Sequence, residues 1–351
     1  MGLAGVTRMK FQLVGTGVVA VAAVVVAIAS GSAVRPSALA SATLTATTAT
    51  GKIVIALGDG SGRRILTSGG WSRVSPDGSQ VAVTKYDVVN NRWVNLRLEL
   101  FASAGGAPTH VIPINCSLFY WSPDSTKLAC VSSRRLLVID AASAAVTTLA
   151  SGVFDTQVSF SPDSTRLAYV QTTSTYYNTN GTLKVIDLAT RAITTVRAHG
   201  VASPIWGPTA IAFSTVQKRG ARRFAFNAAL IQPDGSGFRQ LTRFHPTTEL
   251  YGLLPRAWSA DGTRLLAGVA GLDAWAYREA YAVDPIHGGS RLIAHSLSPA
   301  AFSRDGRYVI GQTGDAETTG LAGSNVVRVP WAHGGRKHIL LRQAVEPSFN
   351  G

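Results

Sequence analysis

Short hydrophobic segments alternate with turn-forming residues along most of this chain. Between residues 156 and 198, "TQVSF", "TRLAYVQT", "TLKVIDL" and "ITTVRA" are such segments, and "SPDS" and "ATRA" separate them in two places. Short runs that are rich in β-branched and aromatic residues, and are bounded by turn signals, are typical of β-strands. The pattern therefore predicts four short strands in this stretch.

The same pattern is repeated along the chain. The string "FSPDSTRLAYV", which starts at Phe160, returns in modified form at Val74, Trp121, Trp258 and Phe302. The aspartates of successive turns are 47, 39, 98 and 44 residues apart, and the longest gap leaves room for a degenerate copy at 203–216. A period of about 40 to 50 residues with four strands in each unit is typical of β-propeller blades.

The repeated turns need aspartate for a structural reason. Proline before it presets the backbone of a type I turn, and the aspartate side chain bonds to its own backbone. A ring separates these carboxylates, one to a blade, so they cannot act as a catalytic pair. We interpret them as turn-builders: Asp77, Asp124, Asp163, Asp261 and Asp305. Glycine follows three of them, whereas Ser125 and Ser164 take its place in two copies, which is a slightly strained choice.

The second half of the unit also recurs, and its first copy lies at the N-terminal end. Residues 53–67 match "LKVIDLATRAITTVR" at 183–197, and a weaker copy lies at 96–112. Residues 344–351 resemble the start of another first half. A closed ring leaves no open sheet edge, so we expect both chain ends to share a closing blade. Six complete repeats and this closing blade favour seven blades, and six is the alternative.

These motifs resemble the TolB-type propeller repeat, also called PD40 or WD40-like. The family pattern is an aromatic residue, Ser-Pro-Asp-Gly, a basic residue and an aliphatic strand, followed by V-x-D and L-T. Here it is seen at 160–163, 166–168 and 185–187, and "DGSGFRQLT" at 234–242 matches the second half. The resemblance covers residues 53–351 and implies an all-β propeller.

The resemblance also bears on function. TolB-like proteins are exported and bind other envelope proteins, and the same repeats form the propeller half of serine peptidases and occur in some polysaccharide lyases. Because the repeats begin at Ile53, we expect a stand-alone propeller without the additional N-terminal domain of the TolB family.

Residues 1–40 differ from the repeats. Arg8 and Lys10 precede the uncharged apolar stretch 13–29, and Ala38-Leu39-Ala40 offers a cleavage site. This is the layout of a signal peptide for export to the periplasm or the extracellular surface. The alternative is an N-terminal membrane anchor formed by residues 13–29. Residues 41–52 are rich in Ser, Ala and Thr and are expected to form a flexible linker before the propeller domain at 53–351.

Charge narrows the choice of partner. The chain has 33 Lys and Arg against 19 Asp and Glu, a formal net charge of +14. The basic residues are scattered and no nucleic-acid-binding motif accompanies them. We therefore expect an envelope or extracellular protein, or an anionic polymer, as the partner of a monomer. Nucleic acid is not expected, and membrane contact is expected only through the N-terminal segment. A generally Arg-rich composition is the alternative explanation of the charge.

The two cysteines are Cys116 and Cys130. They flank the hairpin built on "WSPDS", and an exported protein permits a disulfide between them. The alternative is two buried, reduced cysteines.

Known catalytic and metal-binding motifs are missing from the sequence. It contains no G-x-S-x-G, no H-E-x-x-H and no cysteine pair with zinc spacing, and its seven His are isolated. We therefore expect no catalytic residues, no metal and no cofactor.

Loops on the rim opposite the repeated turns are the candidate binding elements, since propeller loops are free to vary. Several combine aromatic residues with Arg and Asn, a mixture enriched at binding surfaces. The candidates are Trp93, Tyr176, Tyr177, Arg222, Arg223, Trp275 and Tyr277. The alternative is that the aromatic residues pack between blades.

These observations favour an exported, non-catalytic binding or scaffold protein that holds a protein partner or a cell-envelope polymer on its loops. The alternative is a propeller enzyme, a lyase or glycosidase, that acts on polysaccharide in the central channel.

Overall fold

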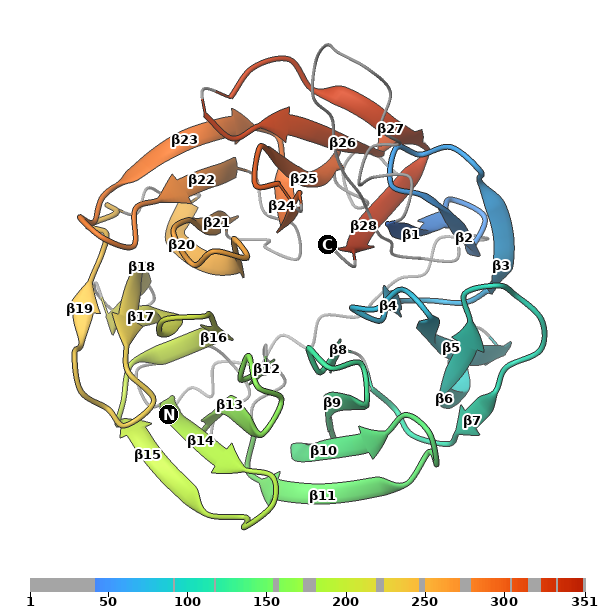
Figure 1. The fold of residues 1–351 in the computed structure, drawn as a ribbon, viewed down its shortest axis with the longest axis horizontal. Helices are drawn as coiled ribbons and strands as arrows, with labels where there is room; N and C mark the ends of the chain where they lie inside the picture. Colours follow the sequence, from blue (N-terminus) through green and yellow to red (C-terminus); the bar gives the residue numbers. More distant parts are fainter. Residues whose placement is uncertain are drawn as a thin grey trace, which may run out of the picture.

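The chain folds into small antiparallel sheets arranged in a ring (Figure 1). The computed structural model describes residues 42–351 except 91, 117, 154–157, 173–180, 219–223, 246–249, 272–278, 304, 315–322, 333 and 350–351. Within this part of the chain, β-strands are the regular structure throughout. In each unit the first strand lies nearest the centre of the ring and the last lies on the outer wall. The predicted all-β propeller is confirmed.

Four of the sheets are four-stranded and follow the chain without interruption. The first two contain β4 (Ser72–Val74), β5 (Gln80–Val89), β6 (Arg92–Ala102) and β7 (His110–Ile112), then β8 (Phe119–Trp121), β9 (Lys127–Ser132), β10 (Arg135–Asp140) and β11 (Val146–Ser151). The others contain β12 (Ser159–Phe160), β13 (Arg166–Gln171), β14 (Thr182–Asp187) and β15 (Ile193–Arg197), and β24 (Ser298–Phe302), β25 (Tyr308–Thr313), β26 (Asn325–Pro330) and β27 (His338–Arg342).

One sheet has eight strands, so the number of blades depends on whether this sheet is counted as one blade or two. Its strands are β16 (Val201–Trp206), β17 (Ile211–Lys218), β18 (Phe224–Ile231), β19 (Arg239–Gln240), β20 (Leu250–Trp258), β21 (Leu265–Gly271), β22 (Glu279–Val283) and β23 (Ser290–His295). A single parallel bridge between Phe226 and Gly252 joins its two four-stranded halves. The described strands therefore form six hydrogen-bonded sheets, or seven four-stranded meanders when these halves are counted separately.

The last sheet joins the two ends of the chain. Its order is β28 (Ala344–Phe349), β1 (Thr43–Thr48), β2 (Lys52–Leu57) and β3 (Arg64–Ser68). The C-terminal strand pairs antiparallel with β1, with Ala344 opposite Thr48. On its inner side Ser348 Oγ accepts the Val74 N–H at 3.0 Å, which bonds this sheet to the next one. The expected sharing of a closing blade by both chain ends is confirmed.

The flexible linker expected at 41–52 is wrong from Thr43 onward, because residues 43–48 form β1. Their small Thr and Ala side chains are nearly all buried between β28, β2 and the following sheet. Thr47 Oγ1 donates to the Gly70 carbonyl, and Thr45 Oγ lies 3.2 Å from Ser72 Oγ. Thr is β-branched and favours strands, so the polar composition of this segment did not indicate a flexible linker.

The hydrophobic core lies between neighbouring sheets. Ile53 and Ile55 of β2, for example, pack against Val81, Val83 and Phe101 of the next sheet. Each such buried side chain stabilises the fold by roughly 1.5–3 kcal/mol relative to exposure. Each sheet therefore depends on its neighbours, as expected for a radial repeat.

The repeated turn is held by its serine as much as by its aspartate. Ser259 Oγ donates to Asp261 Oδ1 at 2.6 Å and accepts the Arg264 N–H at 2.9 Å. Asp261 Oδ1 also accepts the Thr263 N–H at 3.0 Å. The same serine–aspartate bond is present in all five copies: Ser75–Asp77, Ser122–Asp124, Ser161–Asp163, Ser259–Asp261 and Ser303–Asp305.

Serine in place of glycine after the aspartate has a use in both copies where it occurs. Ser125 and Ser164 have φ of 63° and 61°, in the left-handed region. Ser125 Oγ accepts the Asp77 N–H at 3.0 Å, and Ser164 Oγ accepts the Asp124 N–H at 3.1 Å. Each bond joins one turn to the turn of the preceding blade, and so compensates for the strained backbone.

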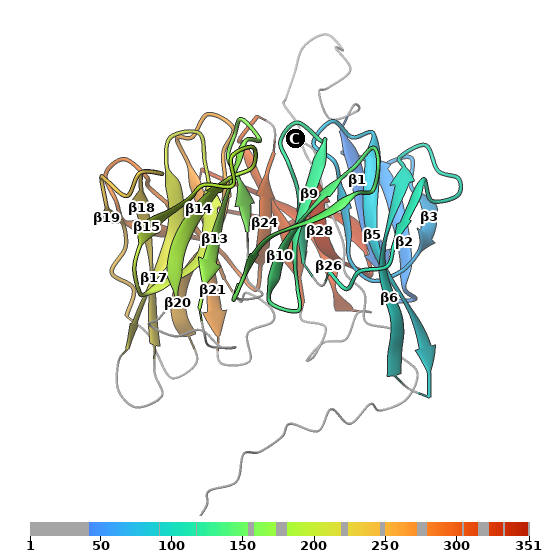
Figure 2. The ribbon, with the colours of Figure 1, turned by 90° about the horizontal axis from the view of Figure 1, so that it is seen from below.

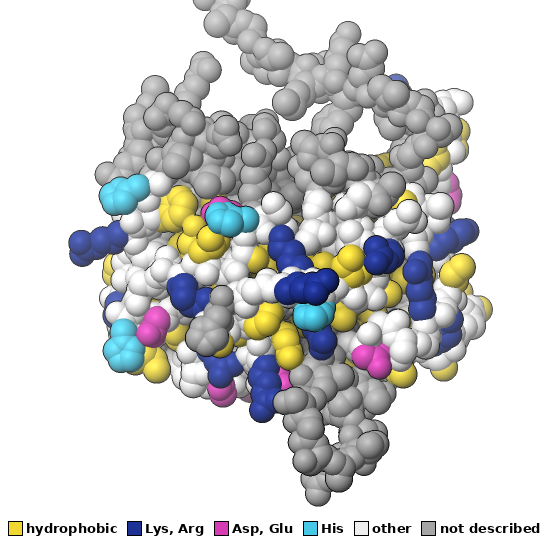
Figure 3. All heavy atoms as spheres, turned by 90° about the horizontal axis from the view of Figure 1, so that it is seen from above, with side chains coloured by type: hydrophobic (Ala, Val, Ile, Leu, Met, Phe, Trp, Pro, Cys, Tyr) yellow, Lys and Arg dark blue, Asp and Glu magenta, His cyan; other side chains and the backbone are white. Residues whose placement is uncertain are grey.

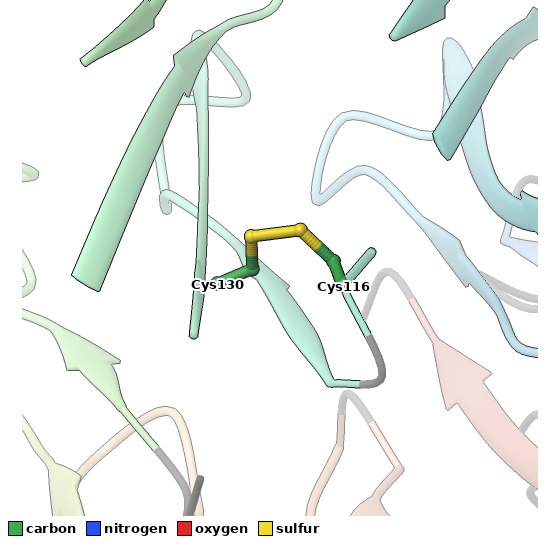
Figure 4. Close-up of a disulfide and its surroundings, with 2 residues drawn as sticks. All are labelled: Cys116 and Cys130. Atoms are coloured by element: carbon green, nitrogen blue, oxygen red, sulfur yellow. A yellow bond between two sulfur atoms is a disulfide. The ribbon is translucent and has the colours of Figure 1, made fainter. Parts of the chain in front are cut away.

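Cys116 and Cys130 form a disulfide (Figure 4). Cys130 lies in β9 opposite Phe119, and Cys116 lies in the segment that leads into β8. Both are buried. The disulfide therefore ties the connection between two blades to the second strand of the blade that follows.

Among the described residues, no helix has the length and apolar character needed to cross a membrane. No three His, Cys, Asp or Glu side chains of these residues are grouped so that they could hold a metal ion.

Candidate functional site

Of the seven predicted binding residues, the structure describes Trp93, which lies in β6. The others lie outside the described residues: Tyr176, Tyr177, Arg222, Arg223, Trp275 and Tyr277. For these six, the interpretation as binding residues stays a prediction.

Trp93 belongs to a long hairpin formed by β5 and β6. Figure 2 shows this hairpin projecting beyond the ends of the other strands on the same side of the ring. The two strands pair from Gln80–Ala102 to Val89–Arg92, with a register shift between Lys85 and Asp87. Asn95 has a φ of 50° beside this shift. Such a β-bulge increases the local twist and turns the side chains that follow it in a new direction.

One face of the hairpin is aromatic. The rings of Tyr86 and Trp93 stack with their centroids 4.9 Å apart. Tyr86 also lies over Gly70, where an added Cβ would come within 3.3 Å of the tyrosine ring. Burial of this ring raises the pKa of Tyr86. Tyr86 is thereby fixed between the connecting loop and Trp93, and holds the indole in place.

Large apolar side chains are exposed near the outer end of the hairpin, next to the polar Asn90 and Arg92. Trp93 is 48% exposed, and Val88, directly opposite it, is 55% exposed. Val89 is exposed to a similar extent. Because these exposed apolar side chains are grouped on one projecting element, they form a candidate contact surface.

The other face of the hairpin carries an ion network. Arg97 donates to Glu99 at 2.9 Å and to Asp87 at 3.2 Å. Asn95 Nδ2 also donates to Asp87. The hydrogen bonds from Asn95 and Arg97 hold the pKa of Asp87 below its usual value. Lys85 Nζ lies 3.6 Å from Glu99 and donates to Thr67 of β3.

This network lies where the hairpin leaves the ring. Glu99 is buried and accepts from Arg97, while Lys85 is partly buried. Burial lowers the pKa of Lys85, the Glu99 carboxylate opposes that shift, and the charges of Arg97 and Lys52 add to it. The contacts join β5, β6 and β3, so the base of the hairpin is rigid and its tip is presented in one orientation.

Aromatic residues at the inner ends of the blades have a structural role. Trp121 Nε1 donates to the Arg73 carbonyl of the preceding blade at 3.0 Å, and Trp258 Nε1 donates to the Ile205 carbonyl at 3.2 Å. The Arg73 guanidinium lies 4.7 Å from the centre of the Tyr120 ring. These innermost aromatic residues therefore make contacts between blades.

The sequence reasoning found Trp93 but not its partners. Tyr86, Asp87 and Arg97 were not identified as a group, because the bulge at Asn95 decides which of them meet. A signal was present in the length of the alternating stretches "VAVTKYDVV" and "RWVNLRLELF", which exceed those of other repeats.

No protein-family model matches this chain, and a comparison with curated proteins finds no match. Solved structures do match over most of it. TolB from Acinetobacter baumannii is 15% identical with a TM-score of 0.53, and the match covers 90% of this chain and 68% of TolB.

Two further structures illustrate the breadth of the likeness. An oligogalacturonate lyase from Vibrio parahaemolyticus is 14% identical with a TM-score of 0.55, covering 86% of this chain and 84% of the lyase. The β-propeller domain of the Trilobed protease from Pyrococcus furiosus is 14% identical with a TM-score of 0.53, covering 77% and 84%. Identities this low show a shared fold and leave activity open. The chain has the TolB-like β-propeller fold.

Proposed function

We propose that this propeller is a non-catalytic binding module that holds a protein partner on the tip of the β5–β6 hairpin. The observation that carries the proposal is the exposed Trp93, stacked on Tyr86 at the end of a projecting element. Trp, Tyr and Arg dominate the binding energy of protein interfaces, especially where their position is fixed before binding.

The hairpin combines the two parts that such an interface needs. Val88, Val89 and Trp93 supply apolar surface at the tip. Asp87, Asn95 and Arg97 lie behind them and would supply a polar rim. The stack and the ion network reduce the conformational entropy that binding would otherwise cost.

We further propose that the protein works outside the cytoplasm. The Cys116–Cys130 disulfide supports this, since disulfides persist mainly in oxidising compartments. Expression of the full chain followed by N-terminal sequencing tests the route. A mature end just after Ala40 supports cleavage of a signal peptide, and an intact N-terminus in the membrane fraction supports the anchor at 13–29. Retention of the whole protein in the cytoplasm would refute export.

The binding role is tested by site-specific cross-linking in cell-envelope extract. A photoreactive residue at position 88 is compared with one at position 146 on outer strand β11, where Val146 is 41% exposed. We expect one discrete cross-linked protein from position 88 and none from position 146.

Affinity measurements with the captured protein then show whether it binds the hairpin or any exposed apolar surface. Trp93→Ala, and Val88→Ser with Val89→Ser, are expected to weaken binding at least tenfold. Val146→Ser with Ile193→Ser removes comparably exposed apolar side chains from the outer wall and is the matched control. Equal affinity of all variants would eliminate the hairpin as the site. Turnover of an acidic polysaccharide by the purified protein would instead support the enzyme alternative.

A further inference from the structure

The outer strands of consecutive blades begin with basic residues along one arc of the ring. The residues are Arg239 in β19, Arg291 in β23, Arg336, Lys337 and His338 just before and at the start of β27, and Arg63 and Arg64 just before and at the start of β3. The outer strands β11 and β15 begin instead with Val146 and Ile193. The turn before β11 has no basic residue and the turn before β15 has one, Arg191, so the arc carries more positive charge than these two blades at the same position.

Contacts between blades make this basic arc continuous. Arg239 donates to the carbonyls of Pro285 and Ile286, in the turn that leads into β23. Arg291 Nη2 donates to the Trp331 carbonyl, ahead of β27, at 2.6 Å. Each arginine thus reaches from its own outer strand to the turn that precedes the next one.

The links continue to the closing blade. Lys337 Nζ donates to the His295 carbonyl at 2.7 Å, which ties the start of β27 to β23. Gly60 lies against the Leu340 carbonyl, where an added Cβ would be 2.7 Å away, so the turn before Arg63 and Arg64 packs on β27. Arg64 in turn donates to the Ser103 carbonyl of the following blade.

Arg64, Arg239, Arg291 and Lys337 donate to backbone carbonyls and not to carboxylates, although Asp59, Asp234 and Asp284 lie in the turns before β3, β19 and β23. Within the described residues, no Asp or Glu forms an ion pair with Arg63, Arg64, Arg239, Arg291, Arg336 or Lys337. Arginine has five N–H donors, and a carbonyl contact uses only one or two of them. Figure 3, which faces the outer wall at β27, shows Lys and Arg side chains recurring across it, with Asp or Glu side chains at fewer points among them.

We propose that this basic arc binds a linear anionic polymer, one that carries carboxylate or phosphate groups at intervals along its length. Cations repeated once per blade on a convex wall match charges repeated along a chain. Arginine is suited to both groups because its planar fork pairs with either. A small anion would meet a single cation here and gain little from the arrangement.

The test uses the full chain and two soluble probes, polygalacturonate for carboxylate and polyphosphate for phosphate. The variant is Arg63→Ser with Arg336→Ser, two exposed residues that make none of the contacts between blades described above. The matched control is Arg135→Ser with Arg191→Asn, which removes the same charge from exposed positions in the blades of β11 and β15. Asn is chosen because Arg191 has a φ of 64° and Asn tolerates that region.

We expect wild type and control to bind at least one polymer equally well, and the arc variant to bind it about tenfold more weakly at low salt. The slope of log affinity against log salt concentration should fall by roughly 1.5 for two lost contacts. The probe that binds identifies carboxylate or phosphate as the preferred group.

Three results would overturn the proposal: no binding of either polymer, equal weakening in variant and control, or binding only to vesicles of anionic lipid. Trp93→Ala is included as a fourth protein. It should bind polymer as wild type does, so a failure of the hairpin proposal leaves this one standing and the reverse also holds.

Discussion

The repeated turns and the β5–β6 hairpin depend on different side-chain contacts within one ring. Each turn repeats the same serine–aspartate bond, five times around the molecule. The hairpin contacts among Tyr86, Trp93, Asp87 and Arg97 do not recur in the other described blades. Contacts that build each blade recur with the repeat, whereas a contact that is made once on an exposed hairpin can serve a partner. We therefore expect substitutions in the turns to affect mainly stability, and substitutions in the hairpin to affect mainly binding.

The largest expected effect comes from opening the ring. Deleting residues 344–351 removes β28, its buried Val345 and the Ser348 bond to the neighbouring sheet. The closing blade then loses its innermost strand, and the faces of the two neighbouring sheets that packed on that strand become exposed. Because a protein of this kind has a stability of only about 5–15 kcal/mol, we expect no cooperative thermal transition by circular dichroism.

The hairpin provides the contrast to that deletion. Replacing residues 88–93 with Asn-Gly removes the tip together with the Trp93 stack. An Asn-Gly turn suits a two-residue hairpin loop, so the loss should not exceed about 1 kcal/mol. If the shortened hairpin proved as damaging as the loss of β28, the separation of scaffold from binding element would be wrong.

An effect smaller than the loss of β28, but larger than that of the shortened hairpin, is expected from a single repeated turn. Ser161→Ala removes the hydroxyl that donates to Asp163 and accepts the Arg166 N–H. The loss should be about 1–2 kcal/mol in urea unfolding, because the N–H is left without its partner. Ser68→Ala on the exposed surface of β3 is the control and should be neutral.

The same variant has a signature in pH. The Ser161 hydroxyl is the main cause that lowers the pKa of Asp163 from 3.8 to about 2. A carboxyl with a lower pKa in the folded state stabilises above its unfolded pKa, and this stabilisation is lost as pH falls from about 4 toward 2. The stability difference between wild type and Ser161→Ala should narrow over that range. A constant difference would mean that the bond does not act through the carboxylate.

The sequence was sufficient to predict the ring, because the ring follows from the periodicity of the repeats. The turn aspartates, the strand halves and the placement of the C-terminal strand all follow from repetition and from the need to close sheet edges. It was insufficient for β1, whose Thr and Ala residues resemble a linker until the neighbouring sheets bury them.

The site was only partly predictable for a different reason. Trp93 stood out as an aromatic residue in a loop-like stretch, but its contact with Tyr86 depends on the register of two strands and on the bulge at Asn95. One sequence does not fix such a register. The carbonyl contacts of Arg239 and Arg291 were missed because they join different blades.

A still smaller effect distinguishes two substitutions at one position. Ser125→Ala keeps a side chain at φ 63° and loses the bond to the Asp77 N–H, so it should cost about 1 kcal/mol. Ser125→Gly loses the same bond but relieves the backbone, and should be nearly neutral. Urea unfolding of the two variants measures the difference. Equal losses would show that the left-handed backbone at this position is not strained.

Only a small change in stability is expected at the residue with the largest expected change in binding. Trp93→Ala removes a side chain that is 48% exposed and makes one aromatic stack, so the free energy of unfolding should fall by less than about 1 kcal/mol. Phe213→Ala, at a fully buried ring between blades, should cost about 3–5 kcal/mol and is the reference. Thermal unfolding of both variants gives the comparison. A large loss for Trp93→Ala would mean that the hairpin tip supports the ring, and the exposed indole would then no longer need a partner to explain it.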